Sequence, residues 1–186
     1  MTSSTSSSLV VALTIFLPVS LGGLPNNAQP KWFERMGAQM SKISVLHDAV
    51  KRGDLAEMKA LLEAGHSLAN ARSETDIRGT YPLHVAAEFG QAHAARLLLD
   101  YGADVTLLDS ENDAIALGWA AFFGRPEVVA VLLAAGSDPS QRNKHGLTPL
   151  ACAVGGTQGR WKQFSNASLE DWQKSVEVIR SHGGVE

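Results

Sequence analysis

The sequence predicts an all-α fold, a solenoid of about four repeated helix pairs. The first observation is a period, because Leu83 recurs as Leu117 after 34 residues and as Leu150 after a further 33. The second is a series of similar segments, LLEAG at 61–65, LLLDYGADVT at 97–106 and VLLAAGSDPS at 131–140. Repeats of this size bury apolar surface between neighbours, and 45% of the residues are hydrophobic. We therefore expect one elongated core.

The second unit shows how each helix pair is delimited. Pro82 is placed to open a short helix, Gly90 to break the chain, and Gly102 to end a second helix that contains Leu97–Leu99. Proline favours the first helical position and glycine the position after the last. An earlier copy of the same pattern, Leu46, His47, Ala49 and Gly53, precedes its counterparts by 37 residues. Four units are therefore visible.

These segments resemble the ankyrin repeat family. The motifs that carry the resemblance are YPLHVAAEFG (81–90), IALGWAAFFG (115–124) and LTPLACAVGG (147–156). The resemblance extends from about Ser44 to the C-terminus and implies an ankyrin-type solenoid. Its departures are Tyr81 for the usual Thr, and Ala116 and Gly118 where Pro and His are usual. The implied repeats are approximately 44–75, 76–109, 110–142 and 143–186.

Two departures from the period mark extra loop residues. The first junction is longer by four residues, since its spacing is 37 rather than 33, and the addition falls within 70–78. The fourth unit carries an insert at 157–167, which contains Trp161 and Phe164. We interpret Gly155–Gly156 before it as a helix break. After it, Ser168 and Asp171 predict the capping of a final helix that has Trp172 on its apolar face.

The N-terminal region predicts targeting. Residues 9–17 (LVVALTIFL) form a short apolar run followed by small residues, so 1–28 is typical of a cleaved signal peptide. This favours a periplasmic or secreted protein. No basic residue precedes the run, and Lys31, Arg35 and Lys42 follow it. That charge bias favours an anchor through 9–24 with cytoplasmic repeats, and a tail without targeting function is a third interpretation.

Residues 29–43 are expected to form an N-terminal capping helix. Trp32, Phe33, Met36 and Met40 recur at helical spacing on one face. Terminal repeats need a cover for their apolar end, which favours a cap over a partner-binding helix.

The composition argues against several kinds of chemistry. A net charge of −3 and a pI near 6.1 provide no basic field for nucleic acid. The single cysteine, Cys152, is expected to be a buried, inert thiol. The resemblance implies that His47 and His84 are structural, bridging neighbouring turns. We predict no catalytic residue, metal site or cofactor.

The resemblance also implies a binding surface, formed by the turn tips and the exposed side of each first helix. Because Phe122 aligns with Lys51, Glu88 and Gly155, we expect its ring to face solvent. We predict a monomer that binds a protein partner on this concave face. The expected contact residues are Arg78, Glu88, Phe89, Glu111, Asn112, Phe122, Phe123, Lys144, His145 and Trp161.

Three alternatives remain open. An exported stack could inhibit a toxin or an enzyme by occluding its active site. The chain could be an enzyme or a small-molecule binder that uses a pocket beside the 157–167 insert. It could also be an adaptor tethered to a membrane through 9–24.

Overall fold

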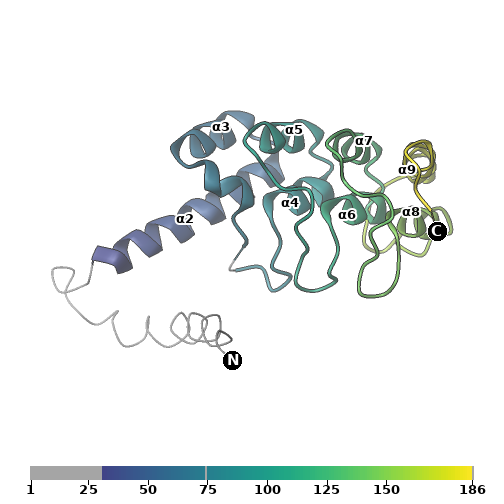
Figure 1. Ribbon diagram of the computed structural model, residues 1–186, viewed down its shortest axis with the longest axis horizontal. Coiled ribbons are helices and arrows are strands. Elements are labelled where there is room, and N and C mark those ends of the chain that lie inside the picture. Colours follow the sequence, from purple (N-terminus) through teal and green to yellow (C-terminus); the bar gives the residue numbers. More distant parts are fainter. Residues whose placement is uncertain (1–30, 74, 186) are drawn as a thin grey trace, which may run out of the picture. The chain divides into compact units, whose positions relative to one another are not determined.

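The computed structural model describes residues 31–73 and 75–185, and within these ranges it contains helices and loops but no strand (Figure 1). This confirms the all-α prediction. The proposed signal or anchor at 1–28 lies outside the described residues. The elements are α2 (Lys31–Arg52), α3 (Leu55–Ala64), the 3₁₀ helix η2 (His66–Asn70), α4 (Pro82–Phe89), α5 (Ala92–Asp100), α6 (Ala116–Phe122), α7 (Pro126–Ala134), α8 (Pro149–Thr157) and α9 (Leu169–Ser181).

The chain divides into two compact units, residues 1–39 and 40–186. The described part of the first unit is the beginning of α2, which continues without a break through the position where we placed the end of a capping helix. Trp32 and Phe33 lie outside the residues whose side chains are described. Their predicted capping contact therefore stays a prediction.

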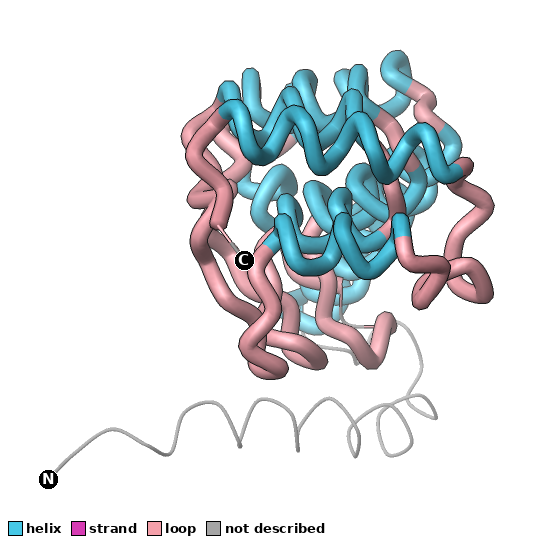
Figure 2. The backbone as a smooth tube through the Cα atoms, turned by 90° about the vertical axis from the view of Figure 1, so that its right-hand side faces the viewer, coloured by secondary structure: helices cyan, strands magenta, loops and turns pink. Residues whose placement is uncertain are grey.

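The second unit is a stack of helix pairs. Helices α4, α6 and α8 lie side by side in one row, and α3, α5, α7 and α9 form a second row (Figure 1). The two rows appear as two layers in Figure 2, with loops connecting them. Three long loops project from the row of α4, α6 and α8. We call them the finger loops, and their described residues are 71–73 with 75–81, 103–115 and 137–148.

Local sequence signals set the ends of these helices. Pro82 is in the first turn of α4, and Gly90 ends it in the left-handed conformation with φ 71°. Both ends were predicted. Ser168 and Asp171 form the predicted capping box of α9, in which each side chain bonds to the other residue's backbone N–H.

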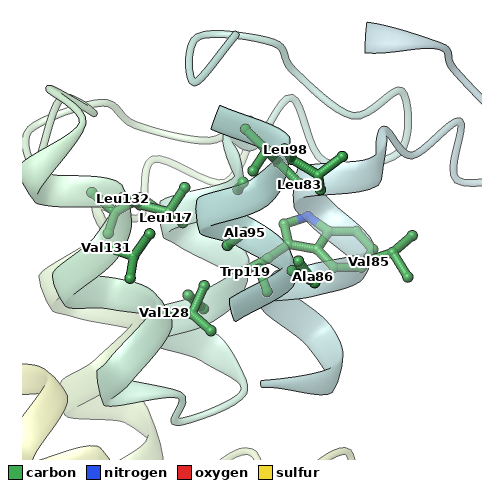
Figure 3. Close-up of a cluster of buried hydrophobic side chains, with 14 of the residues drawn as sticks. Leu83, Val85, Ala86, Ala95, Leu98, Leu117, Trp119, Val128, Val131 and Leu132 are labelled. Atoms are coloured by element: carbon green, nitrogen blue, oxygen red, sulfur yellow. The ribbon is translucent and has the colours of Figure 1, made fainter. Parts of the chain in front are cut away.

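The core lies between successive helix pairs. Leu83, Leu98, Leu117 and Leu132, one from each of α4 to α7, are at most 2% exposed and belong to one cluster (Figure 3). Alanines at matching positions let the helices approach closely. The repeated leucine of the sequence is therefore the residue through which each pair is buried against the next.

Histidines and backbone groups connect neighbouring repeats. His84 Nε2 donates to the carbonyl of Ala114 at 2.9 Å, and His47 Nε2 lies 3.1 Å from the carbonyl of Ala71. Both contacts join a helix to the loop that leads into the following repeat, as the structural interpretation of these histidines predicted. The finger loops are also joined directly, because the backbone N–H of Lys144 donates to the carbonyl of Asn112 at 2.9 Å.

One local prediction was wrong. Gly155 and Gly156 do not break a helix, because α8 continues through both to Thr157. A Cβ atom at Gly155 would lie 2.6 Å from the indole of Trp161, and one at Gly156 would lie 2.2 Å from that of Trp172. The glycines are needed for the close approach of two tryptophans, a contact that the local pattern does not reveal.

We expect Gly156→Ala to destabilise the protein by about 1–3 kcal/mol, because the added methyl group overlaps the Trp172 ring. This loss should occur although alanine has the higher helix propensity. Urea unfolding would measure it. Gly118→Ala in α6 is the matched control, since its Cβ would meet only Ala114 at 3.8 Å. Equal effects of the two substitutions would contradict the role assigned to Gly156.

The buried histidines also predict a pH dependence of stability. Desolvation lowers the pKa of His84 below its ordinary value of 6.5, against the smaller opposing effect of its bond to Ala114, and the pKa of His47 is lowered in the same way. Below pH 6.5 the unfolded chain therefore binds protons that the folded chain does not. Above this pH the two buried histidines are neutral in both states and do not lower the free energy of unfolding. Below it, the free energy of unfolding decreases as the pH falls.

The free energy of unfolding can decrease by at most about 1.4 kcal/mol per pH unit for each proton that the unfolded chain binds and the folded chain does not. It would be measured by urea unfolding on both sides of pH 6.5. His84→Gln keeps a donor for Ala114 but cannot titrate, so its stability should depend less on pH. An identical pH profile for the two proteins would exclude His84 as a source.

Candidate functional site

A pocket of about 590 Å³ lies in the described surface, and we call it the aromatic pocket. Five of its lining residues are aromatic: Trp119, Phe122, Phe123, Trp161 and Phe164. Another five are polar or charged: Arg78, Glu111, Asn112, Asn143 and His145. These residues come from α6, the three finger loops and the 157–167 insert. Loops and helices of three repeats therefore build one site.

Phe122 is at the centre of the aromatic lining. Its ring centroid lies 4.7 Å from that of Trp161, 5.0 Å from that of Phe123 and 5.9 Å from that of Phe164. Tilted and edge-to-face rings at such distances attract one another. The rings therefore support each other around the pocket.

The insert is a fixed wall of this pocket. Trp161 Nε1 donates to the carbonyl of Cys152 at 2.8 Å, and Ser165 Oγ donates to the carbonyl of Phe123 at 2.7 Å. Arg125 Nη2 donates to Asn166 Oδ1 at 2.9 Å. These bonds attach the insert to α8, to the end of α6 and to the start of α7. They hold Trp161 in place before any ligand binds.

A buried carboxylate positions Trp119. Asp109 is 1% exposed and accepts from Trp119 Nε1 at 2.9 Å. It also accepts from the backbone N–H groups of Glu111, Asn112 and Ala114 at 2.6–3.1 Å. One side chain therefore shapes the second finger loop and orients an aromatic ring of the pocket.

Arg78 forms the charged side of the pocket. Its guanidinium lies 3.1 Å from Asp76 and 3.2 Å from Glu88, and its Cζ is 4.9 Å from the Trp119 ring centroid. Partial burial opposes the charged forms of Arg78 and Asp76. Their mutual bonds nevertheless raise the pKa of Arg78 and lower that of Asp76, and Glu88 and Thr80 contribute. Both groups therefore remain ionised in the folded protein.

The structure brings most of the predicted contact residues together. Arg78, Glu111, Asn112, Phe122, Phe123, His145 and Trp161 all line the aromatic pocket. Glu88 reaches it through its ion pair with Arg78. Phe89 lies apart, with Lys51 Nζ 4.9 Å from its ring centroid, and Lys144 is exposed on the third finger loop without lining the pocket.

The expectation that Phe122 faces solvent was wrong. Its ring is half-buried against Trp161 and Phe164 of the insert. Alignment with Lys51, Glu88 and Gly155 could not show this, because the covering residues belong to a segment that the other repeats lack. Trp119 was missed as a lining residue for a related reason, since its equivalents Val85 and Cys152 indicate only an inward-facing position.

The pocket contains little that could act as a nucleophile or a metal ligand. Cys152 is 4% exposed, and desolvation raises the pKa of its thiol to about 11, so it stays protonated and unreactive at neutral pH. Within 31–73 and 75–185, no three His, Cys, Asp or Glu residues are grouped to hold a metal ion. In the same ranges, no helix is both long and apolar enough to cross a membrane.

Comparison with known families assigns the chain to the ankyrin repeat proteins. The family described as "Ankyrin repeats (3 copies)" matches residues 46–143, more than half of the chain. The chain belongs to this family. Ankyrin repeats are generally protein–protein interaction modules and are typically not catalytic.

Individual relatives share the repeats. An ankyrin repeat-containing protein of Treponema pallidum (strain Nichols) is 38% identical over 106 residues, which are 57% of this chain and 34% of that protein. The E3 ubiquitin-protein ligase hecd-1 of Caenorhabditis elegans is 32% identical over 56% of this chain and 4% of its own length. Palmitoyltransferase AKR1 of Lachancea kluyveri is 30% identical over 65% of this chain and 16% of its own length. The chain thus spans about a third or less of these relatives.

We expect Asp109→Asn to destabilise the protein by roughly 1.5–3 kcal/mol, since the amide supplies one acceptor oxygen where four N–H groups now point at a carboxylate. The indole N–H signal of Trp119 should also shift in NMR spectra. Asp138→Asn is the control, because Asp138 is exposed and its side chain accepts from the N–H and hydroxyl of Ser140 in its own turn. A stability change no larger than that of the control would contradict the role of Asp109.

Proposed function

We propose that this chain is a non-enzymatic interaction module that binds a segment of a partner protein along its finger loops, with the aromatic pocket holding the anchoring side chain. The observation that carries this proposal is the pocket itself, about 590 Å³ and lined by five aromatic rings. Binding energy in protein interfaces concentrates in a few aromatic and arginine residues. The family's general role as an interaction module supports the same conclusion.

The rigidity of the site favours recognition without rearrangement. The wall residue Trp161 is bonded to Cys152, and the floor residue Trp119 is bonded to Asp109. A preformed site avoids much of the entropy cost of ordering side chains on binding. Charges at the rim, Arg78, Glu88, Glu111 and Lys144, would then set the register of the bound segment and discriminate between partners.

The N-terminal segment supports a proposal about location. We propose export to the periplasm or the exterior, because 9–17 has the length and apolarity of a signal-peptide core. An exported module could inhibit an enzyme or a toxin by covering its active site. An anchor through 9–24 is the alternative, and the intact mass of the protein from its host would distinguish the two.

A second candidate function is small-molecule binding, and the pocket volume favours it. Ligand pockets commonly span about 300–1,000 Å³ and combine an apolar lining with a few polar groups. Asn112, Asn143 and His145 are such groups here. Native mass spectrometry of the protein from its host would reveal a co-purifying compound, and turnover lost in His145→Ala would indicate an enzyme.

The proposed function predicts that Phe164→Ala weakens partner binding by more than ~1 kcal/mol with little loss of stability. Phe164 lines the pocket but is 57% exposed, so its removal leaves the core intact. Leu169→Ala is the matched control, since Leu169 is 52% exposed and does not line the pocket. Quantitative capture from the host lysate would identify the partner, and calorimetry would then give its affinity for each variant.

Equal affinity of Phe164→Ala and the wild type would exclude the pocket as the anchor site. Phe122→Ala provides a second measurement. Because its ring contacts Phe123, Trp161 and Phe164, it should weaken binding and also lower stability, by about 1–2 kcal/mol.

A further inference from the structure

The ring faces of the aromatic pocket are chemically selective. Each aromatic face carries partial negative charge, and a cation within about 6 Å of the ring centroid is attracted to it, most strongly by tryptophan. Phe122, Trp161 and Phe164 form one group of such rings, at centroid distances of 4.7–5.9 Å from Phe122. All three line the same pocket.

The charged residues that line the pocket are Arg78 and Glu111, and further carboxylates lie beside them. Asp76 and Glu88 pair with Arg78, Asp109 lies under Trp119, and Glu111 lines the pocket at an exposed position. These are four carboxylates. Among the described residues that line the pocket, Arg78 is the one permanent cation. Because Asp76 and Glu88 already pair with Arg78, Glu111 is the charged lining residue left to meet a ligand, and its carboxylate favours a positively charged group.

The protein already places cations of its own over aromatic rings. Arg78 Cζ lies 4.9 Å from the Trp119 ring centroid, and Lys51 Nζ lies 4.9 Å from that of Phe89. Arg78 is held in this position by Asp76 and Glu88. It therefore leaves about 590 Å³ of the pocket open beside rings of the same kind.

We propose that the aromatic pocket binds a lysine or arginine side chain of the partner protein. The inference rests on the proposed function and names the chemistry of the anchor. The aliphatic stem would pack on Phe122 and Trp161, and the charged head would lie against the ring faces and the carboxylate of Glu111. An acidic side chain would be repelled by the carboxylate of Glu111, and an apolar one would make no ion pair with it.

Short peptides can test this proposal on the full chain. The probes are acetylated, amidated glycine peptides with a central lysine, arginine, norleucine or glutamate. Norleucine keeps the carbon chain of lysine without its ammonium group. NMR titration of the Trp119 and Trp161 indole N–H signals would give each Kd. The lysine or arginine peptide should bind roughly five-fold or more tightly than the norleucine peptide, and added salt should weaken the difference.

Two variants assign the selectivity to this pocket. Glu111→Gln should weaken binding of the lysine peptide and leave binding of the norleucine peptide unchanged, because the substitution removes the negative charge and keeps the shape of the side chain. Glu177→Gln makes the same charge change on α9 at an exposed residue that does not line the pocket, so it should have no effect. Phe164→Ala should weaken binding of the lysine and arginine peptides.

The outcomes separate this inference from the proposed function. Equal or tighter binding of the norleucine or glutamate peptide would overturn the cationic anchor and leave an interaction module with another anchor. Absence of any shift with the lysine and arginine peptides would also overturn it. Partner capture by Phe164→Ala and Leu169→Ala would still test the proposed function independently.

Discussion

The helices of the row formed by α4, α6 and α8 are too short to be stable without their neighbours, and the structure depends on this constraint. Helix α4 has eight residues and α6 has seven, whereas isolated helices shorter than about 12 are marginal in water. Each is stable because its apolar face is buried on the next pair, through residues such as Leu83 and Leu117. Hydrogen bonds, such as the one from His84 Nε2 to the carbonyl of Ala114, also join neighbouring repeats. Stability is therefore a property of adjacent repeats.

The fourth repeat differs from the others by its insert and by two tryptophans, and this difference creates the site. Gly156 admits Trp172 of α9, which is fully buried and donates from Nε1 to the carbonyl of Phe122. Gly155 admits Trp161 from the insert in the same way. The two tryptophans approach α8 at adjacent residues. Trp172 packs α9 against α8, and Trp161 forms the wall of the aromatic pocket.

The sequence predicted those features whose causes are local. Pro82 and Gly90 mark the ends of α4, Ser168 marks the start of α9, and the repeated leucines indicate the core. The errors concern contacts between distant residues. Gly155–Gly156 resembles a helix break until Trp161 and Trp172 occupy the space beside it, and Phe122 appeared solvent-facing because the insert that covers it follows no repeat pattern. The insert was detected by its length, but its position against α6 was not predictable from length.

Most core residues do not line the aromatic pocket, but Asp109 connects the packing of the stack with the shape of the pocket. Glu111 is exposed on the second finger loop, so it could change without loss of the stack. Asp109 cannot change so freely, since its carboxylate holds the second finger loop and the ring of Trp119 together. A charge buried at this position is stabilised only by donors that point at it. The shape of the pocket floor is therefore linked to the folding of the loop. Glu111 and His145, by contrast, are exposed at the rim of the pocket.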